Sequence, residues 1–159
     1  MLKQLRTLFV PPKQNKRERQ QADDPIRTAV ATLLVEAALF NGEFDARERA
    51  QIQKLLCQRY ALPEAEADAL IAHVRAWAEN PNNIYRLTKT LKDALPQDER
   101  IALIEMLFEV VYADGTFDDF EANLLRRMGG LLYVTDQERG AARKRVCTRL
   151  GIDETERTG

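Results

Sequence analysis

Residues 106–128 read MLFEVVYADGTFDDFEANLLRRM, and a related stretch, LLVEAALFNGEFDARERAQIQKL, occupies residues 33–55. A shift of 73 positions (109 − 36) aligns the two copies and places Glu36 under Glu109. Each copy consists of an apolar helical run, a turn that contains glycine, and a second amphipathic run, and this order predicts a helix–turn–helix unit. Because a missed repeat leads to the wrong fold, the duplicated unit decides how the rest of the chain is interpreted.

The apolar periodicity predicts an all-α fold, a single-domain bundle of about seven helices with no convincing strand. The first core helix is expected to begin at Asp24-Pro25, because Asp is a good N-cap and Pro suits the first helical position, and to end near Phe40. The later helices are expected to begin at Asp45, Pro63, Ile84, Pro96, Asp118 and Thr135, and the last one to end near Leu150. We expect the two repeats to face each other across an approximate two-fold axis, because that arrangement buries both copies of the apolar face.

Charge is distributed unevenly along the 159 residues. Residues 1–20 carry six Lys or Arg and one Glu, a charge of +5, whereas the remainder carries 18 (24 − 6) basic and 24 (25 − 1) acidic residues, a charge of −6. We therefore expect residues 1–24 to form a basic arm and linker, residues 25–150 the helical domain, and residues 151–159 a frayed tail. The acidic body argues against nucleic acid as a partner. The arm is either a solvated tail or a segment that binds an anionic membrane surface.

Composition excludes several classes of function. The single His73 and the spacing of the two cysteines, Cys57 and Cys147, rule out a zinc site or a His-rich metal site. No nucleophile with its base, phosphate-binding glycine loop or dinucleotide fingerprint occurs in the sequence, so we expect no enzymatic activity. The longest apolar run is too short to span a membrane and the first residues do not resemble a secretory signal. These features predict a cytoplasmic protein, or one peripheral to the inner membrane.

Glu36 and Glu109 each interrupt a long apolar run, LLVEAALF in the first copy and MLFEVVYA in the second. Removing an unpaired carboxylate from water costs several kcal/mol, so each glutamate needs a partner. That partner is an Arg, a set of backbone N–H donors, a bound metal ion or a proton shared with another carboxyl. The structural alternative is an ion pair or a half-exposed position at the edge of the apolar face. The repetition of the position favours a functional role.

The turn segments, NGEFDARE and DGTFDDFE, match one half of a calcium-binding EF-hand loop, with a Gly six residues before a Glu. A standard calcium loop is rejected, because apolar helix occupies the positions of the earlier ligands. Asp45 with Glu48, and Asp118 with Glu121, have the spacing of capping boxes, which satisfy the free N–H groups at a helix start. If a glutamate of the preceding helix approaches these caps, the oxygen-only ligand set suits calcium, magnesium or manganese.

The segments ADGTFDDFE and FNGEFDARE resemble the TerB-like family, named for the bacterial tellurite resistance protein TerB, over about residues 26–150. The resemblance implies an all-helical cytoplasmic bacterial protein that acts in tellurite or general stress response, with protein partners, some of them at the membrane. It also implies a divalent-cation site, whose acidic residues correspond here to Glu36, Asp45, Glu48, Glu109, Asp114, Asp118 and Glu121. Asn41 departs from the family, which prefers Asp at that position. Related domains occur in membrane-anchored co-chaperones, so the alternative is a protein-interaction or membrane-docking adaptor without a metal.

Overall fold

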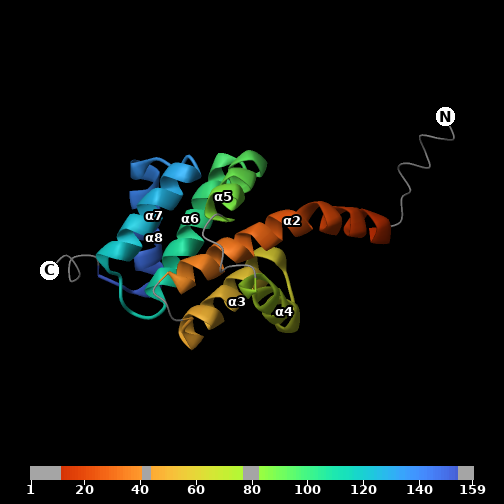
Figure 1. The fold of residues 1–159 in the computed structure, drawn as a ribbon, viewed down its shortest axis with the longest axis horizontal. Helices are drawn as coiled ribbons and strands as arrows, with labels where there is room; N and C mark the ends of the chain where they lie inside the picture. The colour runs from red at the N-terminus through yellow and green to blue at the C-terminus, as the bar shows by residue number, and fades with distance from the viewer. Residues whose placement is uncertain (1–11, 41–43, 77–82, 154–159) are drawn as a thin grey trace.

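Seven α-helices and no strand make up the described part of the chain, and the all-α prediction is confirmed. The computed structural model describes residues 12–40, 44–76 and 83–153, with the backbone alone described for residues 12–24 and 83. The helices are α2 (Pro12–Leu39), α3 (Ala46–Tyr60), α4 (Glu64–Arg75), α5 (Asn83–Ala94), α6 (Gln97–Tyr112), α7 (Asp119–Leu131) and α8 (Asp136–Leu150) (Figure 1). The two-fold relation between the repeats stays a prediction.

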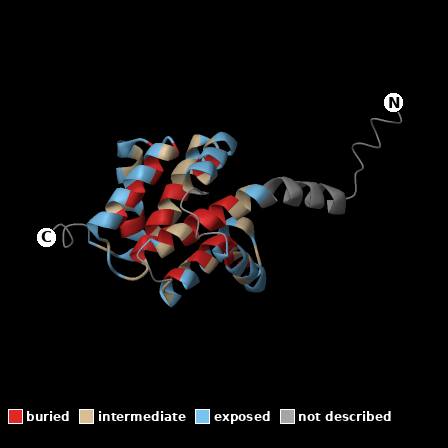
Figure 2. Cartoon of the chain, viewed as in Figure 1, coloured by how far each residue is buried: buried red, intermediate tan, exposed pale blue. Residues whose placement is uncertain are grey.

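The two helices that contain the apolar runs, α2 and α6, form the centre of the bundle. Helix α2 packs against α3, α4, α5 and α6, and α6 packs in addition against α3, α7 and α8. Leu33, Leu34 and Val35 are consecutive residues on different faces of α2, and each is 0% exposed, so this part of the helix is surrounded by protein. Figure 2 shows the buried residues concentrated along both helices. Each fully buried Leu contributes about 1.5–3 kcal/mol relative to an exposed one.

Helix α2 begins earlier than the sequence predicts. We expect a start at Asp24-Pro25, but the helix runs from Pro12 to Leu39 and contains Pro25 in its interior. Residues 13–24, expected to be a linker, are therefore helical. Pro25 lacks the N–H of one helical hydrogen bond, but the Lys, Arg, Glu and Gln that precede it are good helix formers and outweigh that loss. The first part of α2 consequently projects beyond the bundle (Figure 1).

The turn between α6 and α7 has the geometry that the Asp-Gly pair predicts. Gly115 has a φ of +83°, in the left-handed region that glycine adopts without strain. The Asp114 Oδ1 atom accepts hydrogen bonds from the backbone N–H and the hydroxyl of Thr116, at 2.9 and 3.0 Å. The corresponding turn of the first copy, at Asn41-Gly42, lies outside the described residues.

Most of the other predicted helix starts are confirmed. The N-caps are Asp45 for α3, Pro63 for α4, Pro96 for α6, Asp118 for α7 and Thr135 for α8. Helix α8 ends where the sequence predicts, at Gly151, which has a φ of +67°. Asp45, Asp118 and Thr135 can be identified from the sequence because a side-chain cap is a local interaction with the nearest backbone N–H groups. Pro63 and Pro96 make no such hydrogen bond, and they mark a helix start because proline interrupts the preceding helix.

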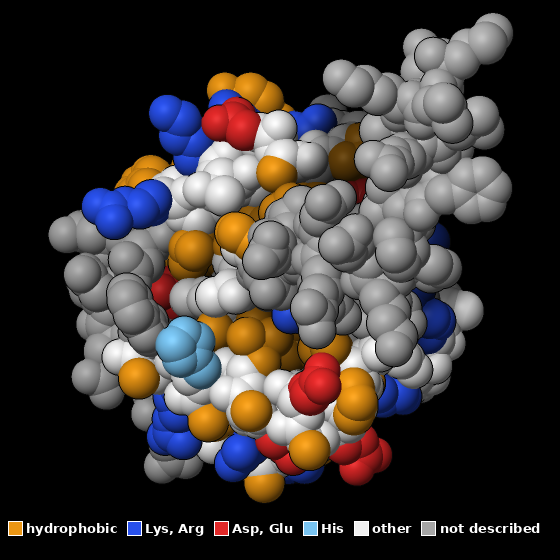
Figure 3. Space-filling view, turned by 90° about the vertical axis from the view of Figure 1, so that its right-hand side faces the viewer, with side chains coloured by type: hydrophobic (Ala, Val, Ile, Leu, Met, Phe, Trp, Pro, Cys, Tyr) orange, Lys and Arg blue, Asp and Glu red, His pale blue; other side chains and the backbone are white. Residues whose placement is uncertain are grey.

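No helix among the described residues has both the length and the apolar composition needed to cross a membrane. The longest helix, α2, opens with the mainly polar and charged stretch PKQNKRERQQADD. The face of the molecule from which α2 projects has apolar side chains toward its centre and Lys and Arg side chains toward its edges (Figure 3).

Candidate functional site

Two glutamates, one from each repeat, are buried in the first turns of α3 and α7. Glu48 is 3% exposed and Glu121 is 1% exposed. Burial raises the pKa of each carboxyl to about 7, and repulsion from Asp114 contributes to the rise in both. The Glu48 carboxylate also raises the pKa of Glu121. The acidic groups of the two repeats therefore lie close enough to repel each other.

Capping hydrogen bonds hold these carboxylates in place. In α7 the capping box is complete, because Asp118 Oδ1 accepts from the Glu121 N–H at 2.8 Å and Glu121 Oε1 accepts from the Asp118 N–H at 3.4 Å. In α3 only half of the predicted box forms. The Glu48 carboxyl accepts from the Asp45 N–H, but Asp45 Oδ1 accepts at 2.6 Å from the N–H of Arg47 and not from that of Glu48. The Arg47 side chain also pairs with Asp45 at 3.1 Å and holds the pKa of Asp45 below its usual range.

Glu36 lies on the central helix α2 and is half-buried as a residue. Both of its carboxylate oxygens are buried, and neither has a hydrogen-bond partner. Its neighbours Val35 and Ala37 are 0% and 2% exposed. Burial alone raises the pKa of Glu36 to about 7, because an apolar environment disfavours the ionised form. Of the partners considered for Glu36, neither a basic side chain nor a backbone N–H donor is present within the described part of the chain.

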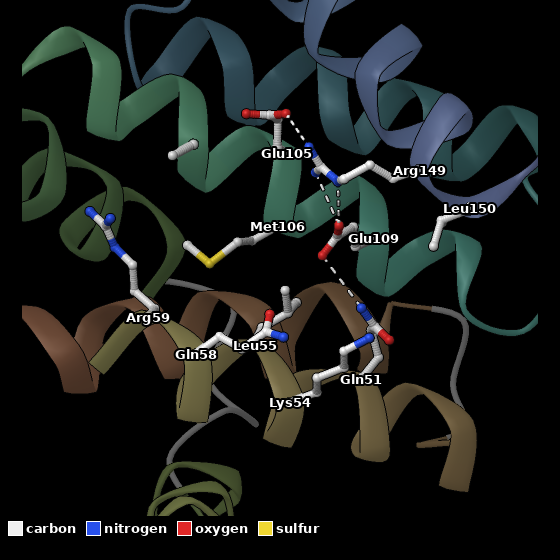
Figure 4. A pocket seen from close by; sticks show the side chains of 11 residues that line it. Gln51, Lys54, Leu55, Gln58, Arg59, Glu105, Met106, Glu109, Arg149 and Leu150 are labelled. Atoms are coloured by element: carbon white, nitrogen blue, oxygen red, sulfur yellow. Dashed lines mark hydrogen bonds and ion pairs between the residues drawn. The ribbon is translucent and has the colours of Figure 1, made fainter. Parts of the chain in front are cut away.

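Glu109, at the matching position of α6, has different surroundings. The Arg149 Nη2 atom lies 3.0 Å from Glu109 Oε1, and Gln51 Nε2 donates to Glu109 Oε2 at 3.4 Å. The Nη1 atom of the same guanidinium lies 3.0 Å from Glu105, so Arg149 bridges two carboxylates one turn apart on α6 (Figure 4). These groups line a groove of about 590 Å³ between α3, α6 and the end of α8. Glu109 therefore has the ion pair that Glu36 lacks.

The sequence did not predict that α8 supplies ion-pair partners for the glutamates of α6. By position alone, Arg145 and Arg149 would suit the dipole of the last helix, which favours cations near a helix C-terminus, or would form a small basic patch. In the structure, both pair with Glu105, at 3.2 and 3.0 Å. The sequence does show that Glu105 and Glu109 are four residues apart and therefore lie on the same face of α6. This spacing does not show which helix packs against that face.

Residues 27–144 match the family described as Tellurite resistance protein TerB. The chain belongs to the TerB family. The matched region contains α3 to α7 in full, together with parts of α2 and α8. The resemblance found in the sequence is thereby confirmed. No curated protein and no solved structure matches the chain.

In this TerB-family chain, the acidic residues expected to bind a cation divide into three groups. The first is the inter-repeat acidic cluster, which consists of Glu48, Asp114 and Glu121 with the caps Asp45 and Asp118 beside them. The second is Glu36, whose carboxylate is buried without a hydrogen-bond partner among the described residues, and the third is Glu109, which belongs to the Arg149 ion-pair network. Within the residues that the structure describes, no three acidic, His or Cys side chains are arranged to hold a metal ion. The chemistry of the inter-repeat acidic cluster nevertheless fits a hard cation, because its ligands are all carboxylate oxygens.

Proposed function

We propose that this TerB-family domain is a non-enzymatic component of tellurite or general stress response that binds a divalent cation between its repeats. Glu48, Asp114 and Glu121 would hold the ion. The observation that carries the proposal is the burial of two like-charged glutamates from different repeats at 3% and 1% exposure. Two buried carboxylates that repel each other are costly when ionised, and a cation offsets that cost.

Protons and the cation compete for the same carboxylates. With pKa values raised to about 7, Glu48 and Glu121 are largely protonated under mildly acidic conditions and largely ionised in alkaline solution. The cation binds the ionised form, so its affinity rises with pH. Because no three ligands are already arranged around the ion, part of the binding free energy is needed to bring them together. We therefore expect an affinity below that of a preformed EF-hand.

Isothermal titration of the full-length protein with calcium, magnesium and manganese at about pH 8 tests the proposal. Glu48→Gln and Glu121→Gln keep a side chain suited to capping but remove the charge, and each should weaken cation binding by about tenfold or more. Glu36→Gln and Glu109→Gln are the matched controls, because they remove the same charge outside the inter-repeat acidic cluster, and they should leave the affinity nearly unchanged. Absence of heat and of thermal stabilisation with all three cations would remove the proposal, as would equal weakening by all four variants.

A second function, docking to an anionic membrane surface or a protein partner at that surface, is favoured by the geometry of α2. The basic residues Lys13, Lys16, Arg17 and Arg19 belong to a helix that projects beyond the bundle, and not to an unstructured linker (Figure 1). Because the helical backbone leads residues 12–24 away from the acidic body, this basic segment can reach an anionic surface with less repulsion from that body.

Co-sedimentation with vesicles tests this second function. The full-length protein should pellet with vesicles of phosphatidylserine and phosphatidylcholine, and not with phosphatidylcholine alone. Replacing Lys13, Lys16, Arg17 and Arg19 with Gln should abolish pelleting, since each basic side chain near an anionic membrane contributes about 1 kcal/mol. Equal pelleting of the variant would leave only a protein partner for this helix.

A further inference from the structure

Three arginines from two helices line a small cavity on the side of the bundle formed by α7 and α8. The cavity has a volume of about 130 Å³ and is bounded by Arg126 of α7 and by Arg139 and Arg143 of α8. Phe117 and Leu125 form part of its apolar wall, and Gly140 lies on the rim supplied by α8. None of these side chains belongs to the inter-repeat acidic cluster or to the Arg149 network.

Arg143 is held in position by two neighbouring side chains that leave its positive charge uncompensated. Arg143 Nε donates to the Tyr112 hydroxyl at 2.8 Å, and its guanidinium lies 4.7 Å from the centre of the Phe117 ring. Phe117 in turn stacks on Tyr112, with 4.8 Å between ring centres. The guanidinium of Arg143 is thus fixed by a ring and a hydroxyl, neither of which neutralises it.

Of the three arginines, only Arg139 forms an ion pair with a carboxylate among the described residues. Asp136 pairs with Arg139 at 2.7 Å, and Arg126 has an amide partner, Asn123, at 3.3 Å. Across the described residues, no ion pair is formed by Arg126 or Arg143. Arg139 and Arg143 are also four residues apart on one helix, a spacing at which like charges destabilise. The cavity therefore carries an excess charge of about +2 in a protein whose body is acidic.

We propose that this cavity is a binding site for a doubly charged tetrahedral oxyanion, either free phosphate or sulfate or the phosphate of a small monoester. Guanidinium groups bind such anions through paired, charge-assisted hydrogen bonds, and the apolar wall strengthens the attraction by excluding water. The volume of about 130 Å³ is enough for a phosphate group. Gly140 leaves the rim open, because a Cβ placed there would meet nothing within 4 Å.

Titration of the full-length protein with inorganic phosphate and with sulfate, followed by calorimetry and by the amide resonance of Gly140, tests the site. Arg126→Gln should weaken phosphate binding by about tenfold or more, because a charge-assisted contact is lost. Arg127→Gln is the matched control, since it removes the same charge from the next residue of α7, which packs over Tyr85 and does not line the cavity. It should change the affinity less than about twofold.

A second pair of variants should act in the opposite direction. Asp136→Asn frees Arg139 from its ion pair and should strengthen phosphate binding, whereas Asp119→Asn removes the same charge at the corresponding position of α7 and should have little effect. Competition by glycerol phosphate then separates a free anion from a monoester, because only a monoester site admits both. Absence of saturable binding by both phosphate and sulfate overturns the proposal, as does equal weakening by Arg126→Gln and Arg127→Gln. The cation proposal is unaffected by either result, because it rests on other residues.

Discussion

Replacing Glu36 with Met should stabilise the protein, and most strongly in alkaline solution. The pKa of Glu36 rises from 4.5 to about 7 because the carboxyl is buried without a partner. Since one pKa unit corresponds to about 1.4 kcal/mol, the ionised carboxylate lowers the free energy of unfolding by about 3 kcal/mol. Met carries no charge, has no polar hydrogen-bonding group to satisfy and is a good helix former, so the substitution removes this penalty.

The sign and the pH window follow from proton binding. Between about pH 4.5 and 7 the Glu36 carboxyl binds more protons in the folded protein than in the unfolded chain, so stability falls as the pH rises through this range. The penalty is absent below about pH 4.5 and complete above about pH 7. From about pH 5.5 to 8.5 the penalty grows by about 2 kcal/mol. For a chain of this length, 3 kcal/mol corresponds to about 6–12 °C in Tm.

Urea unfolding of full-length wild type, Glu36→Met, Glu36→Gln and Glu109→Gln at the two pH values measures these differences. Glu36→Met should exceed wild type by about 3 kcal/mol at about pH 8.5, and Glu36→Gln by less, because a buried amide without a partner costs about 1–3 kcal/mol. Glu109→Gln should instead lose about 0.5–1 kcal/mol, because Glu109 is paired with Arg149. The reasoning is refuted if Glu36→Met is no more stable than wild type at alkaline pH, or if its advantage does not change with pH.

Three further outcomes are expected. Without a divalent cation, Glu121→Gln should reduce the loss of stability between about pH 5.5 and 8, because the Glu121 carboxyl has a raised pKa and binds more protons in the folded protein. Circular dichroism melts at several pH values measure this dependence, and an unchanged slope would contradict the prediction. Arg149→Met should lower the free energy of unfolding by about 1 kcal/mol, because it removes the ion pairs of Arg149 with Glu105 and Glu109. The loss should be smaller in high salt, which screens ion pairs. A loss that does not change with salt would indicate lost packing instead. Gly115→Ala should destabilise the protein by about 1 kcal/mol, because Gly115 has a φ of +83°. Gly140→Ala should stabilise it by about 0.5–1 kcal/mol, because Gly140 lies within α8 and has open space around it. Thermal melts of the two variants should therefore shift in opposite directions.

Much of the fold can be predicted from the sequence because its determinants are local. The starts of α3, α7 and α8 follow from side-chain caps, and those of α4 and α6 from a proline that interrupts the preceding helix. The turn at Asp114-Gly115 follows from the backbone conformations that Gly and Asp adopt. The centre of the bundle is likewise visible in the two apolar runs. The start of α2 is not, because a strong local signal at Asp24-Pro25 competes with helix propensity over the residues before it.

The candidate site depends on contacts between distant residues. The sequence by itself determined that Glu36 and Glu109 occupy equivalent positions, and that Glu48 and Glu121 lie in the first turns of their helices. Only the tertiary structure decided that Arg149 pairs with Glu109 while Glu36 has no partner, and that both capping glutamates are buried. The physical reason is that a helical repeat specifies which face of a helix a side chain occupies, whereas the pKa and the partner of that side chain depend on which other helix packs against the face.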